Sequence, residues 1–153
     1  MDVYCDTSVI GGCFDEEFSE WSNLLMDEIR VGEKTIVLSD LTLEELARAP
    51  AQVRDVIDTI PRSSIRFIAF NERADMLAKA YIAEGIVSED WYIDCRHIAL
   101  ATVERVDVLV SWNFKHIVNY NRIRMYNSVN LKRGFPVIEI RSPREVLYDE
   151  KKL

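Results

Sequence analysis

The 153-residue chain lacks the residues and segments that mark disulfide-stabilised, zinc-binding or membrane proteins. It has three cysteines with no CxxC pair, and two histidines. An odd number of cysteines, two of them in or beside apolar segments, is typical of reduced and mostly buried thiols. It does not favour a disulfide framework or a zinc site. The cysteines are Cys5, Cys13 and Cys95, and the histidines are His97 and His116.

Membrane and export signals are absent from the sequence as well. No segment approaches the roughly 18 consecutive apolar residues of a membrane span. The first residues, which include Asp2 and Asp6, contain no basic stretch typical of a secretory signal. Internal repeats, low-complexity tracts and long linkers are also missing. We therefore expect one cytoplasmic domain over residues 1–153, with no membrane association and a core of ordinary size.

Positive charge is scarce overall but is concentrated at one end of the sequence. The net charge is -7. From Ser111 onward there are nine Lys or Arg and four Asp or Glu, a net of +5, so the preceding residues carry -12. An acidic body with a basic carboxyl-terminal third could hold a metal ion in one place and phosphate in another. The alternative is solvated surface charge without a partner.

Hydrophobic patterning predicts strands that alternate with helices. Short apolar and β-branched runs indicate strands at 3–5, 35–39, 65–70, 107–112 and 136–140. Helices are expected at 14–31, from Thr42 onward, at 51–60, 72–84, 89–105 and 116–131, and from Pro143. This alternation is typical of an α/β protein. We expect a three-layer α/β/α sandwich around a mostly parallel sheet.

Three acidic residues are expected at the carboxyl end of this sheet. Asp6 directly follows the first strand, Glu45 lies in the helix after the second strand, and Asp94 lies near the start of the long helix. Ligands of open α/β sheets bind at this end of the strands. Three neighbouring carboxylates raise one another's pKa unless a cation joins them, and their oxygen atoms suit Mg²⁺ or Mn²⁺.

Each acid also has a simpler interpretation. Asp6 could be a turn residue, and Asp94 could be a helix-start acid favoured by the helix dipole. Glu45 could be the distal half of a capping box that begins at Thr42. A phosphatase with an aspartyl nucleophile is disfavoured because Ser8 stands where that chemistry needs a second acid. A receiver domain is disfavoured because its adjacent acid pair is missing.

Four segments together resemble the PIN domain, the family of Mg²⁺- or Mn²⁺-dependent ribonucleases that includes VapC-type toxins. Residues 3–10, 39–46, 94–101 and 107–116 occur in the family's order and at its usual separations, and the similarity extends to about Ile140. The ordered combination carries the resemblance. It implies a PIN-like fold with metal ligands at Asp6, Glu45 and Asp94.

Neighbouring polar residues match supporting positions of the same family. The resemblance implies that Thr7 or Ser8 orients Asp6 or a metal-bound water. Ser111 and Asn113 match the polar pair that follows the last core strand of the family.

The two histidines and one lysine extend the predicted site. His116 stands where many relatives have a fourth acid, which implies either weaker metal binding or a histidine that reaches the scissile phosphate; a plain surface role is the alternative. The adjacent Lys115 could neutralise a backbone phosphate. His97 lies one turn after Asp94 and is expected either to support that carboxylate or to be a satisfied core histidine.

The resemblance implies a Mg²⁺- or Mn²⁺-dependent endoribonuclease that hydrolyses RNA phosphodiester bonds and leaves a 5′-phosphate. Its catalytic residues would be Asp6, Glu45, Asp94 and His116. It further implies the toxin of a toxin–antitoxin pair, with an antitoxin protein as partner, and a homodimer. Basic side chains after Ser111 are expected to track a single RNA strand. The alternative is a catalytically weakened PIN-like module that binds RNA or a partner protein.

Overall fold

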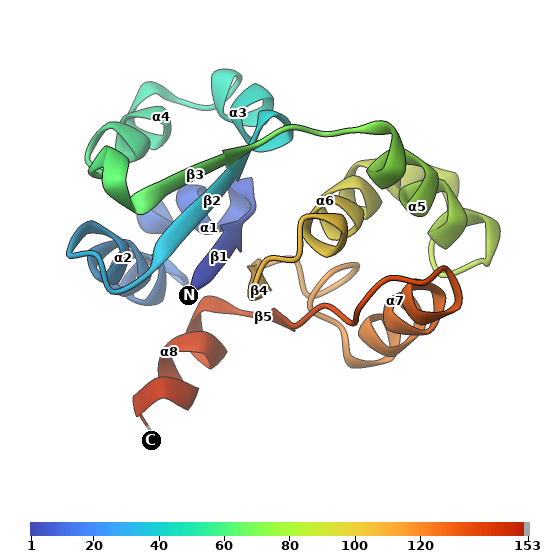
Figure 1. Ribbon diagram of the computed structural model, residues 1–153. Coiled ribbons are helices and arrows are strands. Elements are labelled where there is room, and N and C mark those ends of the chain that lie inside the picture. The colour runs from blue at the N-terminus through green and yellow to red at the C-terminus, as the bar shows by residue number, and fades with distance from the viewer. Residues whose placement is uncertain (152–153) are drawn as a thin grey trace.

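The computed structural model describes residues 1–151, with side chains described for residues 1–147. A five-stranded parallel sheet lies at its centre, in the order β3-β2-β1-β4-β5 (Figure 1). The strands are β1 (Asp2–Cys5), β2 (Thr35–Ser39), β3 (Ile65–Ile68), β4 (Val108–Val110) and β5 (Ile140–Arg141). The predicted third strand lies at an edge of the sheet, and the α/β class is confirmed.

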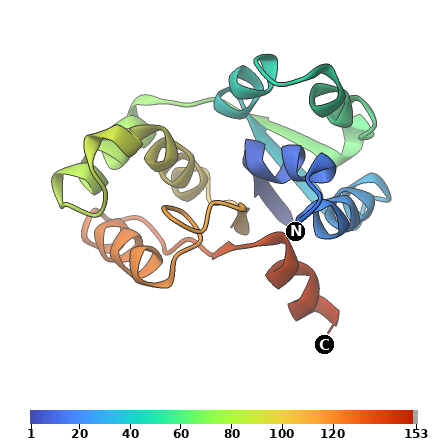
Figure 2. The ribbon, with the colours of Figure 1, turned by 180° about the vertical axis from the view of Figure 1, so that it is seen from behind.

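Helices cover both faces of the sheet, which makes the three predicted layers (Figures 1 and 2). The helices are α1 (Thr7–Gly11), α2 (Ser19–Arg30), α3 (Asp40–Ala47), α4 (Ala51–Asp58), α5 (Glu72–Ala83), α6 (Tyr92–Val103), α7 (Tyr120–Lys132) and α8 (Pro143–Lys151). Three short 3₁₀ turns are η1 (Gly12–Phe14), η2 (Arg62–Ser64) and η3 (Glu89–Trp91). No helix within the described part of the chain is long and apolar enough to cross a membrane.

Alternate residues of each strand enter two separate cores. Val3 and Cys5 pack on one side, with apolar residues of α1, α2, α4 and α8. Tyr4 points to the opposite side, where α5, α6 and α7 supply most of the apolar contacts. Because both faces are covered, residues 3–5 of β1, residues 36–38 of β2 and all of β4 are apolar, which is typical of parallel sheets, whereas the edge strands β3 and β5 each contain an arginine. The three cysteines are buried free thiols, as the sequence predicts.

The chain order creates one point where the sheet's direction of growth reverses. From β1 the chain moves outward through β2 to β3, and it then returns to the other side of β1 to form β4 and β5. The carboxyl ends of β1 and β4 therefore flank a topological switch point, the usual ligand position in such sheets. Asp6 follows β1 there, and Ser111 follows β4.

Helix α3 begins earlier than the sequence predicts, and this changes the interpretation of Glu45. Ser39 is the N-cap: its Oγ accepts a hydrogen bond from the backbone N–H of Thr42 at 3.1 Å. The predicted capping box from Thr42 to Glu45 is therefore wrong, because the strand delivers an extended Ser39 to the cap position first. Glu45 lies beyond the first turn and has no capping role.

The predicted strand at 136–140 is also mostly wrong, since β5 contains only Ile140–Arg141. The side chain of Asn127, on α7, accepts a hydrogen bond from the N–H of Ile138 at 2.8 Å and donates one to its carbonyl at 3.1 Å. These bonds occupy the backbone groups that a longer ladder would need. Pairing with β4 begins at Glu139, whose carbonyl accepts from the N–H of Leu109.

Three predicted helices start late because turns precede them. Before α2, the N–H groups of Phe18 and Ser19 both donate to the carbonyl of Asp15. Before α7, the Asn119 side chain caps the helix by accepting from the N–H of Arg122. The segment before α6 forms the turn η3. In contrast, Asn71 and Pro143 begin α5 and α8 at the predicted residues.

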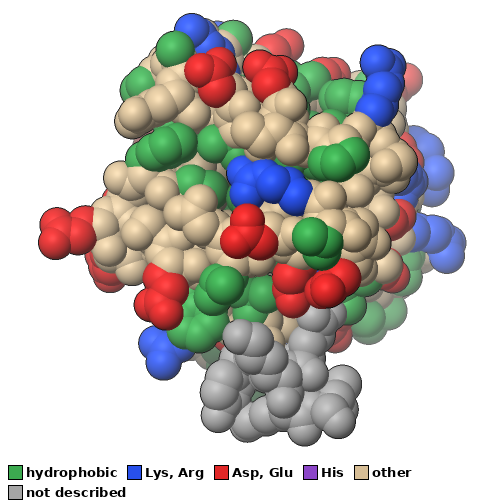
Figure 3. Space-filling model, turned by 90° about the vertical axis from the view of Figure 1, so that its left-hand side faces the viewer, with side chains coloured by type: hydrophobic (Ala, Val, Ile, Leu, Met, Phe, Trp, Pro, Cys, Tyr) green, Lys and Arg blue, Asp and Glu red, His purple; other side chains and the backbone are tan. Residues whose placement is uncertain are grey.

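Charge on the surface over α2 and α4 is mixed. Figure 3 shows acidic and basic side chains interspersed with hydrophobic ones on this side of the molecule, with no histidine visible. Both histidines are buried, at 2% exposed for His97 and 3% for His116. Neither of them is therefore a solvated surface residue, and the plain surface role considered for His116 is wrong.

Candidate functional site

Asp6 lies at the switch point and is held by two hydroxyl groups. Ser8 Oγ donates to its Oδ1 and Ser111 Oγ donates to its Oδ2, both at 2.6 Å. The N–H of Val9 reaches Oδ1 at 3.4 Å, so Asp6 also caps the short helix α1. The side chain is only 6% exposed. Burial raises its pKa, while the charge of His97 and the two hydroxyls oppose this change.

Glu45 is held by a buried hydrogen-bonded chain that starts at the sheet. His97 Nε2 lies 2.5 Å from Glu45 Oε1, and His97 Nδ1 lies 2.7 Å from the hydroxyl of Tyr4. The Tyr4 hydroxyl in turn lies 2.7 Å from Ser39 Oγ. Both ring nitrogens of His97, the Tyr4 hydroxyl and Ser39 Oγ thus each have a hydrogen-bond partner, and every member of the chain is satisfied.

Of the two roles considered for His97, support of the Asp94 carboxylate is wrong, whereas the satisfied core histidine is confirmed, because the residue is 2% exposed and both ring nitrogens have partners. Its hydrogen bonds go to Glu45 and Tyr4 and not to Asp94. The helical spacing places the two residues on neighbouring sides of α6, but the ring turns toward β1 and α3. Burial acts to raise the pKa of Glu45; the hydrogen bond and charge of His97, the Thr7 hydroxyl and the charge of Arg96 outweigh it, and the pKa is lowered.

Asp94, in the first turn of α6, meets the loop that follows β4. Asn113 Nδ2 donates to Asp94 Oδ2 at 3.3 Å, and His116 Nδ1 lies 3.3 Å from the same oxygen. Burial raises the pKa of Asp94, opposed by the charges of His116 and His97. Burial lowers the pKa of His116, opposed by Asp94. The residue at the position of the expected fourth acid thus acts as a partner of the third.

The remaining predicted residues lie around these three carboxylates. Thr7 Oγ1 is buried and has no partner with hydrogen-bond geometry among the described residues, although it is close enough to Glu45 to lower the pKa of that carboxyl. Lys115 Nζ lies 5.4 Å from the ring centroid of Trp91, whose ring packs 4.0 Å from that of His116. Lys115 therefore lies at the rim of the group of three carboxylates, whereas the Thr7 hydroxyl is buried beside Glu45.

His97 connects the three acids electrostatically, because its charge lowers the pKa of each. Among the residues whose side chains are described, 1–147, no three acidic, histidine or cysteine side chains converge at metal-ligand spacing. The donor chemistry nevertheless fits Mg²⁺ or Mn²⁺, which take oxygen ligands and are often held by one or two carboxylates together with water. Oδ2 of Asp6 accepts one hydroxyl and keeps a further lone pair for a cation.

A surface pocket of about 340 Å³ lies beside this group. Ser8 and Asn113, which hold Asp6 and Asp94, form part of its lining. Phe18 and Trp112 form its aromatic wall, with ring centroids 4.2 Å apart and planes inclined by 16°. The pocket therefore borders two residues that contact the acids, although Asp6, Glu45 and Asp94 do not line it themselves.

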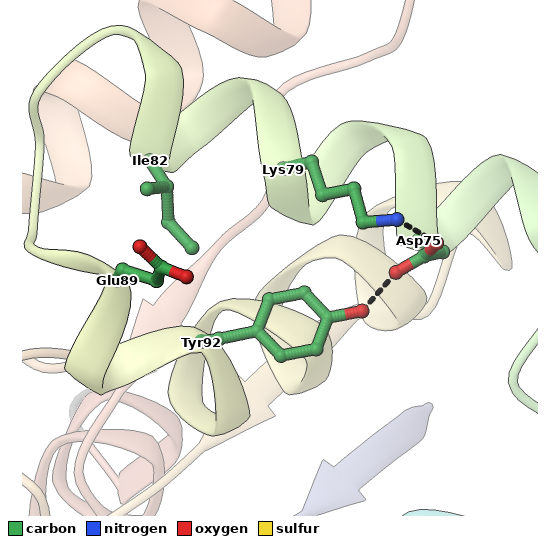
Figure 4. A pocket seen from close by; sticks show the side chains of 5 residues that line it. All are labelled: Asp75, Lys79, Ile82, Glu89 and Tyr92. Carbon is green, nitrogen blue, oxygen red and sulfur yellow. Dashed lines mark hydrogen bonds and ion pairs between the residues drawn. The ribbon is translucent and has the colours of Figure 1, made fainter.

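A second pocket, of about 570 Å³, contains none of the predicted site residues (Figure 4). It lies between α5 and the segment of η3 and α6. Three of its polar side chains already bind one another: the Tyr92 hydroxyl donates to Asp75, and Lys79 pairs with Asp75 at 2.9 Å. Size alone does not identify the functional site.

Sequence reasoning missed Tyr4 and Trp91. Tyr4 belongs to an apolar run and was expected to be simply a buried strand residue, yet its hydroxyl joins β1 to His97 and β2. Trp91 precedes Asp94 by three residues and packs on His116. Aromatic residues beside a predicted acid are a weak signal, and only the fold shows which of them contact the site.

Comparison with known proteins identifies the fold and not a close relative. No protein-family model matches the chain, and no curated protein shows significant similarity to it. Several solved structures do resemble it. VapBC2 from Rickettsia felis, bound to a DNA fragment from their promoter, matches with a TM-score of 0.57 and 18% identity over 93% of this chain and 98% of that chain.

Two further structures give a similar result. FitAcB from Neisseria gonorrhoeae has a TM-score of 0.57 and 13% identity over 92% of this chain and 97% of that chain. VapC20 from Mycobacterium tuberculosis, a toxin that cleaves the sarcin–ricin loop, has a TM-score of 0.55 and 11% identity over 74% of this chain and 91% of that chain. At these identities the likeness shows that the chain shares their fold.

Proposed function

We propose that this chain, whose fold is the VapC-type PIN-domain fold, is a Mg²⁺- or Mn²⁺-dependent endoribonuclease. One observation carries the proposal. Asp6 is buried at the switch point with hydroxyl partners, and Glu45 and Asp94 lie near the same histidine. Among the described residues, no Lys or Arg forms an ion pair with any of the three. Such carboxylates favour a cationic ligand.

The three carboxylates would hold the metal, and their partners would fix them in place. A bound Mg²⁺ or Mn²⁺ supplies charge stabilisation at phosphorus and lowers the pKa of a water ligand. Ser8 and Ser111 orient Asp6, and His97 fixes the rotamer of Glu45. Outer partners of this kind keep metal ligands in their productive orientation.

The surroundings of the acids suit a single nucleic-acid strand. The aromatic wall of the 340 Å³ pocket can receive a base beside the scissile phosphate, and Lys115 at the rim can neutralise a backbone phosphate. The unpartnered Thr7 hydroxyl offers a donor or acceptor to substrate or water near Glu45. RNA is proposed over DNA because the structural neighbour VapC20 is a toxin that cleaves the sarcin–ricin loop.

The likeness to VapBC2 and FitAcB supports a toxin–antitoxin role. We propose an antitoxin protein as the partner that restrains the nuclease. A homodimer and a cytoplasmic location stay predictions.

A second candidate function is a catalytically weakened module that binds RNA or a partner protein. The pairing of His116 with Asp94 favours it, because an imidazole takes the position of a fourth acid and removes one negative charge from the site. The same pairing also fits a nuclease in which His116 positions Asp94. The two candidates differ in cleavage and in metal dependence.

An RNA cleavage assay with and without Mn²⁺ tests the proposal. Wild-type protein is expected to cut RNA only with the metal. Asp94→Asn should reduce the rate by about 100-fold or more, since replacing an outer partner of a metal site already costs about 10–100-fold. Asp90→Asn, an exposed acid on η3, is the matched control and should stay within about twofold of wild type. Equal cleavage by wild type and Asp94→Asn would rule the nuclease out, and RNA binding without cleavage would support the weakened module.

A further inference from the structure

Arg96, which no sequence pattern singled out, is held between two aromatic rings. It lies on α6, two residues after Asp94. Its guanidinium carbon is 5.6 Å from the ring centroid of Phe70 and 5.4 Å from that of Tyr92. Aromatic faces attract a guanidinium and restrict its motion. The cation is therefore positioned before any ligand arrives.

The hydrogen-bonding groups of Arg96 remain largely unused. Its Nε is buried without a hydrogen-bond partner, and Arg96 forms no ion pair with any residue whose side chain is described. Arg66 provides the contrast, because it pairs with Asp2 at 2.8 Å and with Glu104 at 3.7 Å. A guanidinium that is fixed in place but not paired has donors available for an anion.

The position of Arg96 places this cation at the edge of the proposed site. Phe70 follows the carboxyl end of β3, and its N–H donates to Asp40 Oδ1 at the start of α3. Helix α3 carries Glu45, and Arg96 is close enough to lower the pKa of that carboxyl. Glu45 is bonded to His97 instead, so the carboxylate does not occupy the guanidinium of Arg96.

We infer that Arg96 binds a backbone phosphate of single-stranded RNA next to the bond that the acids cleave; this inference rests on the proposed function. The planar fork of an arginine matches two phosphate oxygens, which lysine cannot do. Lys115 and Arg96, both packed on aromatic rings, would then contact the strand on either side of the carboxylates. The guanidinium thus offsets the repulsion between the acids and the polyanion.

RNA binding measured at several salt concentrations tests this role. Fluorescence anisotropy with a short single-stranded RNA is carried out on protein that also carries Asp6→Asn, which prevents cleavage. Arg96→Gln should weaken binding and reduce the salt slope by about 0.7, the value for one phosphate contact on a single strand. Arg96→Lys should keep most of the slope but bind more weakly. Arg30→Gln removes the same charge from an arginine already paired with Asp27, and should leave the slope unchanged.

A substrate with one neutral methylphosphonate at each position in turn identifies the contact. When the methylphosphonate replaces the phosphate that Arg96 contacts, which we expect near the cleavage site, Arg96→Gln should not weaken RNA binding any further. A salt slope unchanged by Arg96→Gln, an equal effect of Arg30→Gln, or no RNA binding at all would overturn the inference. A purely structural role would lower the melting temperature without changing the slope. Cleavage by wild type is judged separately, so the nuclease can stand while the assignment of Arg96 fails.

Discussion

Acidic residues have different partners at the two ends of the central sheet. At the amino end, Arg66 pairs with Asp2 and Glu104, and the buried Lys34 pairs with Glu28 at 2.7 Å. At the carboxyl end, the side-chain partners of the acids are hydroxyls, imidazoles and the amide of Asn113. No Lys or Arg among the described residues forms an ion pair with Asp6, Glu45 or Asp94 there.

We interpret the acids at the amino end as residues that stabilise the fold, and those at the carboxyl end as residues that can bind a cation. An arginine beside a carboxylate cancels its charge permanently, whereas a serine or an asparagine orients it and leaves the charge available. The orientation has an energetic cost, because burial raises the pKa of both Asp6 and Asp94. Sites that trade stability for function are expected to show this pattern.

Removing the partner of an acid at each end should give the sharpest contrast. His97→Phe keeps an aromatic ring but leaves Glu45 without its hydrogen bond, so RNA cleavage should fall by about 10–100-fold. Arg66→Gln, the control at the amino end, should leave cleavage within about twofold. Initial rates in Mn²⁺ measure both effects, and melting temperatures show that the variants are folded. Equal losses of RNA cleavage in the two variants would contradict the claim that only the carboxyl end of the sheet serves catalysis.

A smaller effect is expected on stability, with opposite signs at the two ends. In metal-free buffer at pH 7, Asp6→Asn should raise the melting temperature, because it removes a buried charge without a cationic partner. Asp2→Asn should lower the free energy of unfolding by up to about 1 kcal/mol, the usual limit for an exposed pair. For a chain of this size about 1 kcal/mol corresponds to roughly 2–4 °C.

The pH dependence of stability follows from the raised pKa of Asp6. The folded protein binds this proton more tightly than the unfolded chain does, so stability falls as the pH rises from the ordinary value of 3.8 through the raised one. The loss is complete once the pH exceeds the raised pKa. Asp6→Asn should therefore make the stability curve fall less steeply over this interval, as measured by thermal unfolding. A steeper fall would show that Asp6 is stabilised by an unrecognised partner.

The sequence predicts the position of Asp6 and Ser111 well, because apolar runs with polar ends locate strand termini. It predicts Glu45 less securely. Ser39 and Thr42 are both good caps, and only the extended backbone of Ser39 decides between them. The position of Asp6 after β1 thus follows from the local sequence. Whether Glu45 caps a helix depends instead on the residue at which β2 ends.

Contacts between distant elements account for the errors. The apolar sequence at 136–140 has strand character, but Asn127 on α7 binds the backbone of Ile138 and prevents longer pairing. The partner of His97 depends on the Tyr4 hydroxyl and on α3, which helical spacing does not report. The sequence does not single out Arg96 for the same reason, since Phe70 and Tyr92 come together at its side chain only in the folded chain.

Isothermal titration of the metal-free protein with Mn²⁺ tests the central claim, that the carboxyl end of the sheet is a cation site. Wild type and Asp2→Asn should bind Mn²⁺ with equal affinity. Asp6→Asn should bind at least about tenfold more weakly, as expected for a change at a ligand. No binding by wild type, or equal binding by wild type and Asp6→Asn, would contradict the account.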